Sequence, residues 1–354
     1  MRKQRPDTAA GTFTPRGESE GEGATGAPAP PHDASPRKAA ARSEKRRHTR
    51  RRFLKGMGAL TLVAVGVPAH ARYVEPNLID VSEHTVYLPG LPERADGLRI
   101  VQLTDLHRGP VTPDDTIRQA VAAAAELKPD LFVLTGDYVK YDLADAAPLA
   151  DLLRPLAGKA RLGLFGCLGN HDYADWTGNT MARALSDRAG VTMMRNEGRL
   201  IEPGLFLAGI EDEVRGRPDI GRALAGAPAD RDGATVVLAH NPRSVFSCDT
   251  RPLLMLSGHT HGGQIRIPGL APRVPPDMKG FPLVDGWGRF DKAWLFVNRG
   301  VGMTAFPYRL GCRPEVSVIT LRRGDGPPVR HGDLAEKAFR KAQKIASDAR
   351  RLIG

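Results

Sequence analysis

The chain has 354 residues, of which 41% are hydrophobic, enough for one large core or two smaller ones. Its formal net charge is +11, but the positive excess lies at the ends: residues 1–71 hold 14 Lys/Arg against 6 Asp/Glu, and residues 322–354 hold 9 against 4. The stretch between them holds 28 against 30, which excludes a basic nucleic-acid channel there, so no nucleic-acid partner is expected.

The N-terminal part has the composition of a disordered segment followed by an export signal. Residues 1–48 are rich in Pro, Gly, Ala and Ser and show no hydrophobic period, which predicts disorder. Residues 49–71 contain TRRRFLK, a short apolar run and the small residues Ala69 and Ala71, which predicts a twin-arginine signal. The run is shorter than the ~20 residues of a membrane span. We therefore expect the twin-arginine translocase as a partner and a periplasmic or other extracytoplasmic location, with membrane-surface association if the signal is retained. The alternative is a basic patch beside a buried helix.

Residues 72–323 alternate between strand-like apolar runs and helical patterns, which predicts one α/β domain with antiparallel pairing in its second half. The expected strands are 98–103, 131–134, 162–168, 235–239, 253–256, 294–298 and 316–321, with paired strands within 191–209. The expected helices are 116–127, 144–156, 181–188 and 220–225. A Pro/Gly-rich insertion covers 267–288, and residues 324–354 are expected to form a basic tail with a charged helix from Leu334.

The three cysteines are too few for a disulfide framework and lack zinc-finger spacing. Cys167 lies in an apolar strand and is expected in the core. A disulfide between Cys248 and Cys312 is a possibility that the sequence neither supports nor excludes.

Polar residues follow five of the expected strands. The motifs are DLH at 105–107, GD at 136–137, GNHD at 169–172, HN at 240–241 and GHTH at 258–261. A single strand-end Asp is usually a cap or turn residue, but open α/β sheets build their sites at the carboxyl ends of strands. Asp, Asn and neutral His supply the oxygen and nitrogen ligands of metal ions. His259 and His261 are one residue apart, so in a strand or strand-end turn both imidazoles face neighbouring ions, and the adjacent glycines keep the wall thin.

This ordered set of motifs, spread over residues 98–321, resembles the calcineurin-like metallophosphoesterases. The GGQI after GHTH, the NRGVG at 298–302 and the leader resemble the exported bacterial YkuE/YaeI-type branch. The resemblance implies an α/β fold, a two-layer β-sandwich flanked by helices, with two divalent metal ions at the strand ends: Mn²⁺ first, iron or zinc as alternatives. By motif position, one ion would be held by Asp105, His107 and His261, the other by Asn170, His240 and His259, with Asp137 bridging them.

The resemblance also implies a mechanism, in which a metal-bridging hydroxide attacks phosphorus and no protein nucleophile is needed. His171 would stabilise charge or protonate the leaving oxygen, and Asp172 would orient its imidazole. The alternative is that both residues only stabilise a turn. Export points to a small-molecule or lipid phosphoester of the cell envelope, either a lipid or a wall polymer, and hence to a phosphodiesterase.

Two features leave alternatives open. Lys140 stands where the family commonly has the second Asp of GD-x-x-D, which would alter metal affinity unless Asp142 compensates. The alternative function is therefore a metal-dependent binding protein with a degenerate, non-catalytic site. Phe306, Tyr308 and Arg309 either form a rim for substrate or pack a loop. A serine hydrolase is not expected, because no G-x-S-x-G motif occurs.

Overall fold

The computed structural model describes residues 36–229, 233–248 and 252–331. The chain divides into two units, residues 1–60 and 61–354. In the first unit α1 (Pro36–Thr61) begins, so residues 36–48 are helical where the sequence predicted disorder. Ala, Lys, Arg and Glu dominate this stretch, and their helix propensity explains the difference. Residues 1–35 lie outside the described residues. Among the described helices, none combines the length and hydropathy that crossing a bilayer requires.

The second unit starts with short helical segments, of which the last two contact the body of the protein. They are η1 (Leu62–Gly66), α2 (Val67–Ala69), η2 (His70–Val74) and η3 (Glu75–Asn77). The buried Ala71 accepts a hydrogen bond at its carbonyl from the Arg309 N–H, 2.9 Å away. The buried Glu75 carboxylate accepts one from the Cys312 N–H at 2.6 Å. The folded body therefore begins before the predicted boundary at residue 72.

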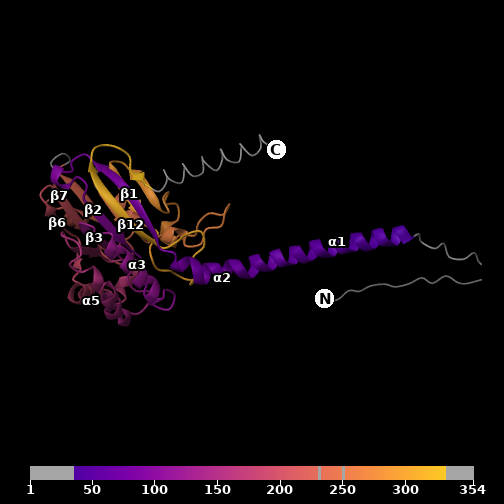
Figure 1. The fold of residues 1–354 in the computed structure, drawn as a ribbon. Coiled ribbons are helices and arrows are strands. Elements are labelled where there is room, and N and C mark those ends of the chain that lie inside the picture. The colour runs from indigo at the N-terminus through magenta and orange to yellow at the C-terminus, as the bar shows by residue number, and fades with distance from the viewer. Residues whose placement is uncertain (1–35, 230–232, 249–251, 332–354) are drawn as a thin grey trace, which may run out of the picture. The chain divides into compact units, whose positions relative to one another are not determined.

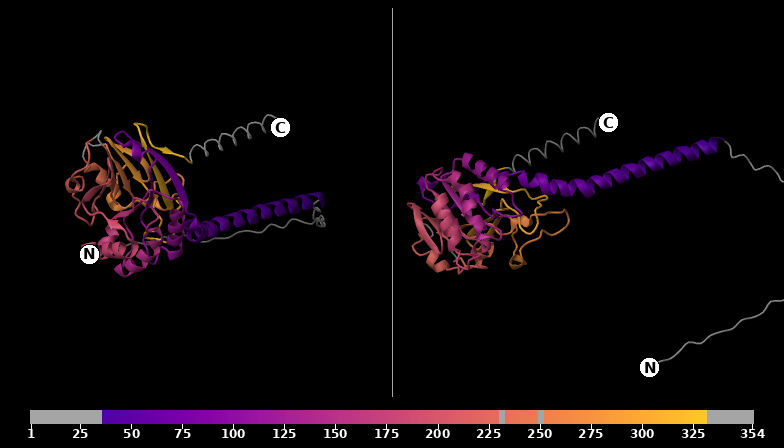
Figure 2. Two further views of the ribbon diagram at one scale, coloured as in Figure 1. Left: turned by 60° about the vertical axis from the view of Figure 1, so that its left-hand side comes forward. Right: turned by 90° about the horizontal axis from the view of Figure 1, so that it is seen from below.

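The described strands form two mixed sheets (Figures 1 and 2). The seven-stranded sheet has the order β13-β1-β12-β2-β3-β4-β5 and the six-stranded sheet the order β10-β11-β9-β8-β7-β6. The first contains β1 (Asp80–Leu88), β2 (Arg99–Leu103), β3 (Leu131–Thr135), β4 (Leu164–Cys167), β5 (Thr192–Met193), β12 (Glu315–Arg323) and β13 (Val329–Arg330). The second contains β6 (Glu197–Glu202), β7 (Leu205–Gly209), β8 (Ala234–Leu238), β9 (Leu254–Ser257), β10 (Gly286–Phe290) and β11 (Ala293–Val297).

Helices and short helical turns connect the strands. The α-helices of the body are α3 (Asp114–Glu126), α4 (Ala146–Leu153), α5 (Asn179–Ala189) and α6 (Ile220–Ala223). The turns are η4 (Glu93–Ala95), η5 (Leu143–Asp145), η6 (Arg154–Leu156), η7 (Asn170–Tyr173), η8 (Pro242–Phe246), η9 (His261–Gly263) and η10 (Pro276–Met278). The predicted α/β sandwich flanked by helices is confirmed.

Side chains that alternate along each strand divide the core into layers. Ile100 and Leu131 point into the cluster between the two sheets, whereas Val101 and Phe132 point into the cluster under α3, α4 and α5. A third cluster covers the outer face of the six-stranded sheet, against α6 and η8. Because neighbours in a strand face opposite sides, strands that are buried on both faces appear as continuous apolar runs. The expected core position of Cys167 is confirmed, and the three cysteines form no disulfide.

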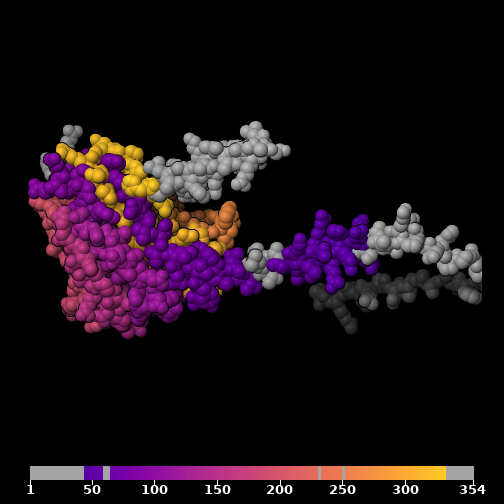
Figure 3. Space-filling model, viewed as in Figure 1, coloured from indigo at the N-terminus to yellow at the C-terminus, as the bar shows by residue number. Residues whose placement is uncertain are grey.

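The strand pairing corrects two predictions. The second half of the domain is not mainly antiparallel, because β7, β8, β9 and β11 pair in parallel. Each connection among these strands crosses back over the sheet, for example through α6 or η8, and so returns the chain to the same end. The body also extends past the predicted end at residue 323, since β13 pairs with β1, which lies beside β12 (Figure 1). On the surface, yellow atoms of the C-terminal part of the body lie against purple atoms of its N-terminal part (Figure 3). The helix predicted from Leu334 lies outside the described residues.

His84 of β1 gives the fold a pH-dependent stability. Trp287 donates its indole N–H to His84 Nδ1 at 3.1 Å, and His84 Nε2 lies 3.0 Å from the Ser82 hydroxyl. Nδ1 must therefore stay unprotonated. Burial, with positive neighbours, lowers the pKa of His84 to about 4. The unfolded chain takes up this proton near pH 6.5, so stability is lost as the pH falls from 6.5 towards 4.

We expect His84→Gln to lose this pH dependence. The free energy of unfolding of the wild type should fall by about 3 kcal/mol more than that of the variant between pH 7 and pH 4. Urea denaturation at several pH values measures the difference. His48→Gln, on the exposed side of α1, is the control and should follow the wild type. Parallel pH profiles for the wild type and His84→Gln would contradict the assignment.

Candidate metal centre

The candidate ligands converge at the edge shared by the two sheets. Asp105 and His107 follow β2, Asp137 follows β3 and Asn170 follows β4, all in the seven-stranded sheet. The others come from the six-stranded sheet: His240 follows β8, and His259 and His261 follow β9. Parallel strands place these carboxyl ends side by side, so residues far apart in the sequence meet.

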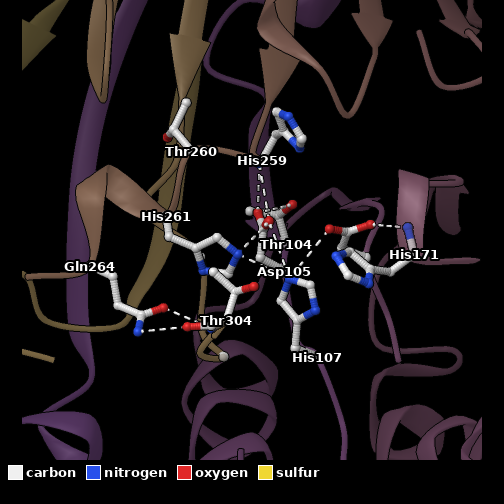
Figure 4. A network of polar contacts seen from close by, with 12 residues as sticks. Thr104, Asp105, His107, His171, His259, Thr260, His261, Gln264 and Thr304 are labelled. Carbon is white, nitrogen blue, oxygen red and sulfur yellow. Dashed lines mark hydrogen bonds and ion pairs between the residues drawn. The ribbon is translucent and has the colours of Figure 1, made fainter. Parts of the chain in front are cut away.

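The first group of candidate ligands consists of Asp105, His107 and His261. His107 Nε2 lies 3.0 Å from His261 Nε2, and Asp105 Oδ1 lies 3.3 Å from His261 Nε2 and 3.9 Å from His107 Nε2. All three side chains are buried, and Figure 4 shows the two imidazoles on either side of the space below Asp105. Two nitrogens and a carboxylate oxygen at these separations can bind one divalent ion.

The second group consists of Asp137, His240 and His259. His240 Nε2 lies 3.1 Å from His259 Nδ1 and 3.2 Å from Asp137 Oδ2. The same Oδ2 lies 3.3 Å from His107 Nε2, so one carboxylate oxygen stands between the two groups. Burial opposes ionisation, but the imidazoles of His240, His171 and His107 hold the pKa of Asp137 well below its usual range. An ionised carboxylate in this place is suited to bridge two cations.

Asn170 gives a further test of whether a metal fits. Its side chain lines the same cavity as Asp137 and His259, and its buried Oδ1 has no hydrogen-bond partner. A buried carbonyl oxygen without a partner is costly, and a bond to a metal ion would satisfy it. The residues present therefore fit two divalent ions, and the structure brings together all seven candidate ligands that the resemblance implied.

The ligands sit on strained backbone. Asp105, His107, Asp137, His259 and His261 have φ of 52°, 45°, 55°, 71° and 53°. A left-handed conformation costs a non-glycine residue roughly 1–2 kcal/mol. It also places the two histidines of GHTH: β9 ends at Ser257, and the left-handed turn that follows sends His261 to the first group and His259 to the second, as the motif positions imply.

Comparison with known proteins agrees with this geometry. Residues 98–263 match the family model described as calcineurin-like phosphoesterase. Over 289 residues the chain is 35% identical to the uncharacterized metallophosphoesterase YkuE of Bacillus subtilis, covering 77% of this chain and 98% of that protein. The chain belongs to the calcineurin-like metallophosphoesterases. As a metallophosphoesterase it is a phosphoester hydrolase of a family that uses divalent metal ions.

Other metallophosphoesterases are similar as well. The phosphodiesterase YaeI of Escherichia coli is 34% identical, over 77% of this chain and 99% of that protein. The UDP-2,3-diacylglucosamine pyrophosphatase LpxG of Chlamydia muridarum is 27% identical, over 66% of this chain and 86% of that protein. Among solved structures, a dimetal phosphatase from Danio rerio matches with a TM-score of 0.40 and 12% identity, over 64% of this chain and 99% of that one.

His171 lies beside the metallophosphoesterase centre, but its partner is not the predicted one. The carboxylate of Asp172 accepts backbone N–H groups from Gly169, Asp137 and Tyr138 at 2.8–2.9 Å, so it shapes the loop and does not orient the imidazole. The His171 ring is held by the main chain instead, with Nδ1 2.8 Å from the Lys140 carbonyl. Burial, aided by neighbouring positive groups, lowers the pKa of His171 to about 4. In this environment the imidazole is neutral, with its proton on Nδ1.

Lys140 contacts His171, the candidate catalytic residue, and none of the candidate metal ligands. Its Nζ lies 3.4 Å from His171 Nε2 and donates to the hydroxyl of Thr304 at 2.5 Å. The sequence placed Lys140 near the site through its motif position, but it gave no signal for Thr304. Asp142, the suggested compensating carboxylate, caps η5 by accepting the N–H of Ala144.

Asp277 lies at the centre although no motif pointed to it, and Arg309 takes the second of its two expected roles, the packing of a loop. Asp277, in the Pro/Gly-rich insertion, accepts hydrogen bonds from His259 Nε2 at 2.9 Å and from Asn241 at 2.8 Å. It thus orients a ligand of the metallophosphoesterase centre, as a carboxylate beside a ligating histidine does. Arg309 is buried and binds main-chain carbonyls, including those of Gly300 and Gly302, so it packs a loop.

Gly169 lies too close to the bridging carboxylate to carry a side chain. A Cβ there would stand 2.3 Å from Asp137 Oδ1. We expect Gly169→Ala to displace Asp137 and to lower kcat by about 10²-fold, the usual effect of a 1 Å misplacement. Steady-state kinetics with saturating metal measures this. Gly221→Ala, where the nearest atom is 3.6 Å from the added Cβ, is the matched control. Equal losses in both variants would mean that crowding at Asp137 is not the cause.

Proposed function

We propose that this protein is a phosphodiesterase that uses two divalent ions, Mn²⁺ first, to hydrolyse a phosphoester of the cell envelope. The observation that carries the proposal is the position of Asp137 Oδ2, 3.3 Å from His107 Nε2 and 3.2 Å from His240 Nε2. One carboxylate shared by two ligand groups is what a two-ion centre requires. The names of two relatives, a phosphodiesterase and a lipid pyrophosphatase, support a diester substrate.

The chain's own residues have separate tasks in this proposal. The bound ions would supply Lewis-acid polarisation of the phosphoryl group and a water of lowered pKa. Asp137 holds the two ligand groups at a fixed separation, and its Oδ1 accepts the N–H of His171 at 2.8 Å, which places that residue next to the ions. His171 Nε2 points to Lys140 Nζ, 3.4 Å away, so the pair can exchange a proton with the leaving oxygen.

The alternative of a degenerate binding protein depends on Lys140. Its side chain lies against His171 and Thr304, outside both ligand groups, so the lysine removes no candidate ligand. Catalysis is therefore the better-supported function.

A direct assay separates the two functions. Purified full-length protein is loaded with Mn²⁺, Fe²⁺ or Zn²⁺ and given bis(p-nitrophenyl) phosphate or p-nitrophenyl phosphate. We expect metal-dependent hydrolysis that is faster for the diester and highest with Mn²⁺. Tight metal binding without hydrolysis of either compound would favour the binding protein. Faster hydrolysis of the monoester would overturn the diester preference.

The location is part of the proposal and has its own test. We propose that the chain is exported through the twin-arginine translocase, on the basis of the TRRRFLK motif at residues 49–55. Arg50→Lys combined with Arg51→Lys should retain the protein in the cytoplasm, whereas Arg52→Lys, the matched control, should not. Fractionation followed by immunoblotting measures this. Normal export of the double variant would overturn the proposed route. A membrane-bound pool of the exported wild type would indicate that the leader is retained.

A further inference from the structure

A cavity of about 520 Å³ opens directly on the metal centre. One part of its lining consists of candidate ligands and His171, and the other part comes from the segments 264–277 and 304–306. Such a volume is typical of small-molecule sites. A substrate whose phosphoryl group lies at the ions would therefore extend its remaining part into this second part of the cavity.

The second part of the cavity is apolar and open to solvent. Leu270, Phe306 and Ile267 line it while remaining 67%, 50% and 49% exposed. Val274 and Ile265 add to the same wall. Isolated exposed apolar residues are common, but several around one cavity indicate a binding surface. The guanidinium of Arg273 lies 5.8 Å from the centre of the Phe306 ring, so one positive charge borders this wall.

Apart from Arg273, the polar side chains of the same wall already have hydrogen-bond partners within the protein. Gln264 uses its amide to donate to the carbonyls of Thr304, Phe306 and Tyr308 at 2.9–3.0 Å and to accept the Thr304 N–H at 2.7 Å. Figure 4 shows Gln264 beside Thr304. Through these bonds, the glutamine of GGQI fixes the loop that carries Phe306.

The side chains of Thr260 and Asp277 are occupied in a similar way. Thr260 donates its hydroxyl to the carbonyl of Val284 at 2.6 Å, and Asp277 accepts from His259 and Asn241. A polyol or sugar chain needs hydrogen-bonding groups on the wall that receives it, because its own hydroxyls lose water on binding. An acyl or alkyl chain needs only apolar surface. The composition of the wall thus favours a phosphoester with a hydrocarbon chain over one with a polyol or sugar chain.

We propose that the substrate is a lipid phosphodiester, whose phosphoryl group lies at the metal ions and whose hydrocarbon chain lies along Ile267, Leu270 and Phe306. This inference rests on the proposed phosphodiesterase activity and narrows its substrate to the lipid class. Arg273 lies where it can pair with the single negative charge of a diester or with a further phosphate of the headgroup. The hydrolysis itself is unchanged: water adds to phosphorus, one P–O ester bond breaks, and the leaving oxygen takes the proton.

The test compares two substrates that differ only in chain length. p-Nitrophenyl methyl phosphate and p-nitrophenyl octyl phosphate have the same charge and the same leaving group, and both are used as monomers with the Mn²⁺-loaded full-length protein. We expect kcat/KM to be about 30-fold higher for the octyl compound, since burial of several methylenes favours its transition state. Ile267→Ser combined with Leu270→Ser should reduce this ratio about tenfold. Both residues are highly exposed, so their replacement should not prevent folding.

The control and the contrary outcomes are distinct. Leu200→Ser, at an equally exposed position in β6 outside this cavity, should keep the wild-type ratio. A wild-type ratio near one would overturn the lipid inference and leave the phosphodiesterase proposal standing. An unchanged ratio in the double variant, or faster hydrolysis of poly(glycerol phosphate) than of the octyl compound, would also overturn the inference. Failure to hydrolyse any of these compounds would overturn the proposed function, and the lipid inference with it.

Discussion

Asp137→Asn is expected to lower phosphoester hydrolysis by more than about 10³-fold while leaving the fold intact. A neutral amide can bridge two cations only weakly, because it has one acceptor oxygen and no charge. The backbone should not change, since Asn adopts the left-handed conformation at least as readily as Asp, and residue 137 has φ of 55°. Steady-state kinetics with Mn²⁺ measures the loss of hydrolysis, and elemental analysis of the purified variant measures how much metal it still binds.

The controls for Asp137→Asn separate charge from folding. Thermal unfolding should show a transition of wild-type cooperativity. Asp151→Asn is the control: it removes a carboxylate that is exposed and paired with Arg188, so the variant should keep full activity. A folded Asp137→Asn protein with activity within about tenfold of wild type would be incompatible with a carboxylate-bridged centre.

His171→Ala is expected to retain the metal and to lose roughly 10² to 10⁴ in kcat. The residue follows Asn170 and its N–H binds Asp137 Oδ1 at 2.8 Å, a main-chain contact that alanine preserves. What alanine removes is the imidazole whose Nε2 lies 3.4 Å from Lys140 Nζ. If the pair of Lys140 and His171 delivers a proton to the leaving oxygen, the loss should be larger for phenyl than for p-nitrophenyl esters, because the poorer leaving group needs the proton more.

The leaving-group comparison also defines what would disprove this role. Equal losses for both esters would limit His171 to charge stabilisation. Loss of bound metal on elemental analysis would place His171 among the ligands, as its proximity to His107 and Asp137 permits. His70→Ala, outside the centre, serves as the control and should keep both the metal and the rate.

Most strands could be predicted because their burial on both faces leaves continuous apolar runs. β2, β3, β8 and β9 begin and end within a residue or two of the expected positions. β1 was not predicted, since it carries charged residues and the buried His84 among its apolar ones. The division into two sheets was supplied by the family resemblance. Sheet membership depends on pairings such as Asp80 with Glu315, which join residues too distant for local patterns to reveal.

The candidate ligands could be predicted because they stand in short motifs directly after strands. No comparable motif marks Asp277 or Thr304, because both residues reach the centre from loops. It also assigned Asp172 to His171, because adjacency in GNHD suggested a contact. The structure shows why adjacency misleads there: successive side chains of η7 point in different directions, and the carboxylate turns to the N–H groups of Asp137 and Tyr138.

The left-handed backbone of the ligands has a consequence for how stable this protein can become. Five non-glycine residues in that conformation, each disfavoured by roughly 1–2 kcal/mol, amount to a cost comparable to the net stability of a typical domain. The packing of the two sheets behind these residues offsets this cost, and the strained turns position the candidate ligands for metal coordination. Heat resistance cannot be improved by relaxing these turns without dispersing the ligands. Engineering for durability would therefore have to act on the outer helices and on surface loops that lie outside the cavity at the metal centre.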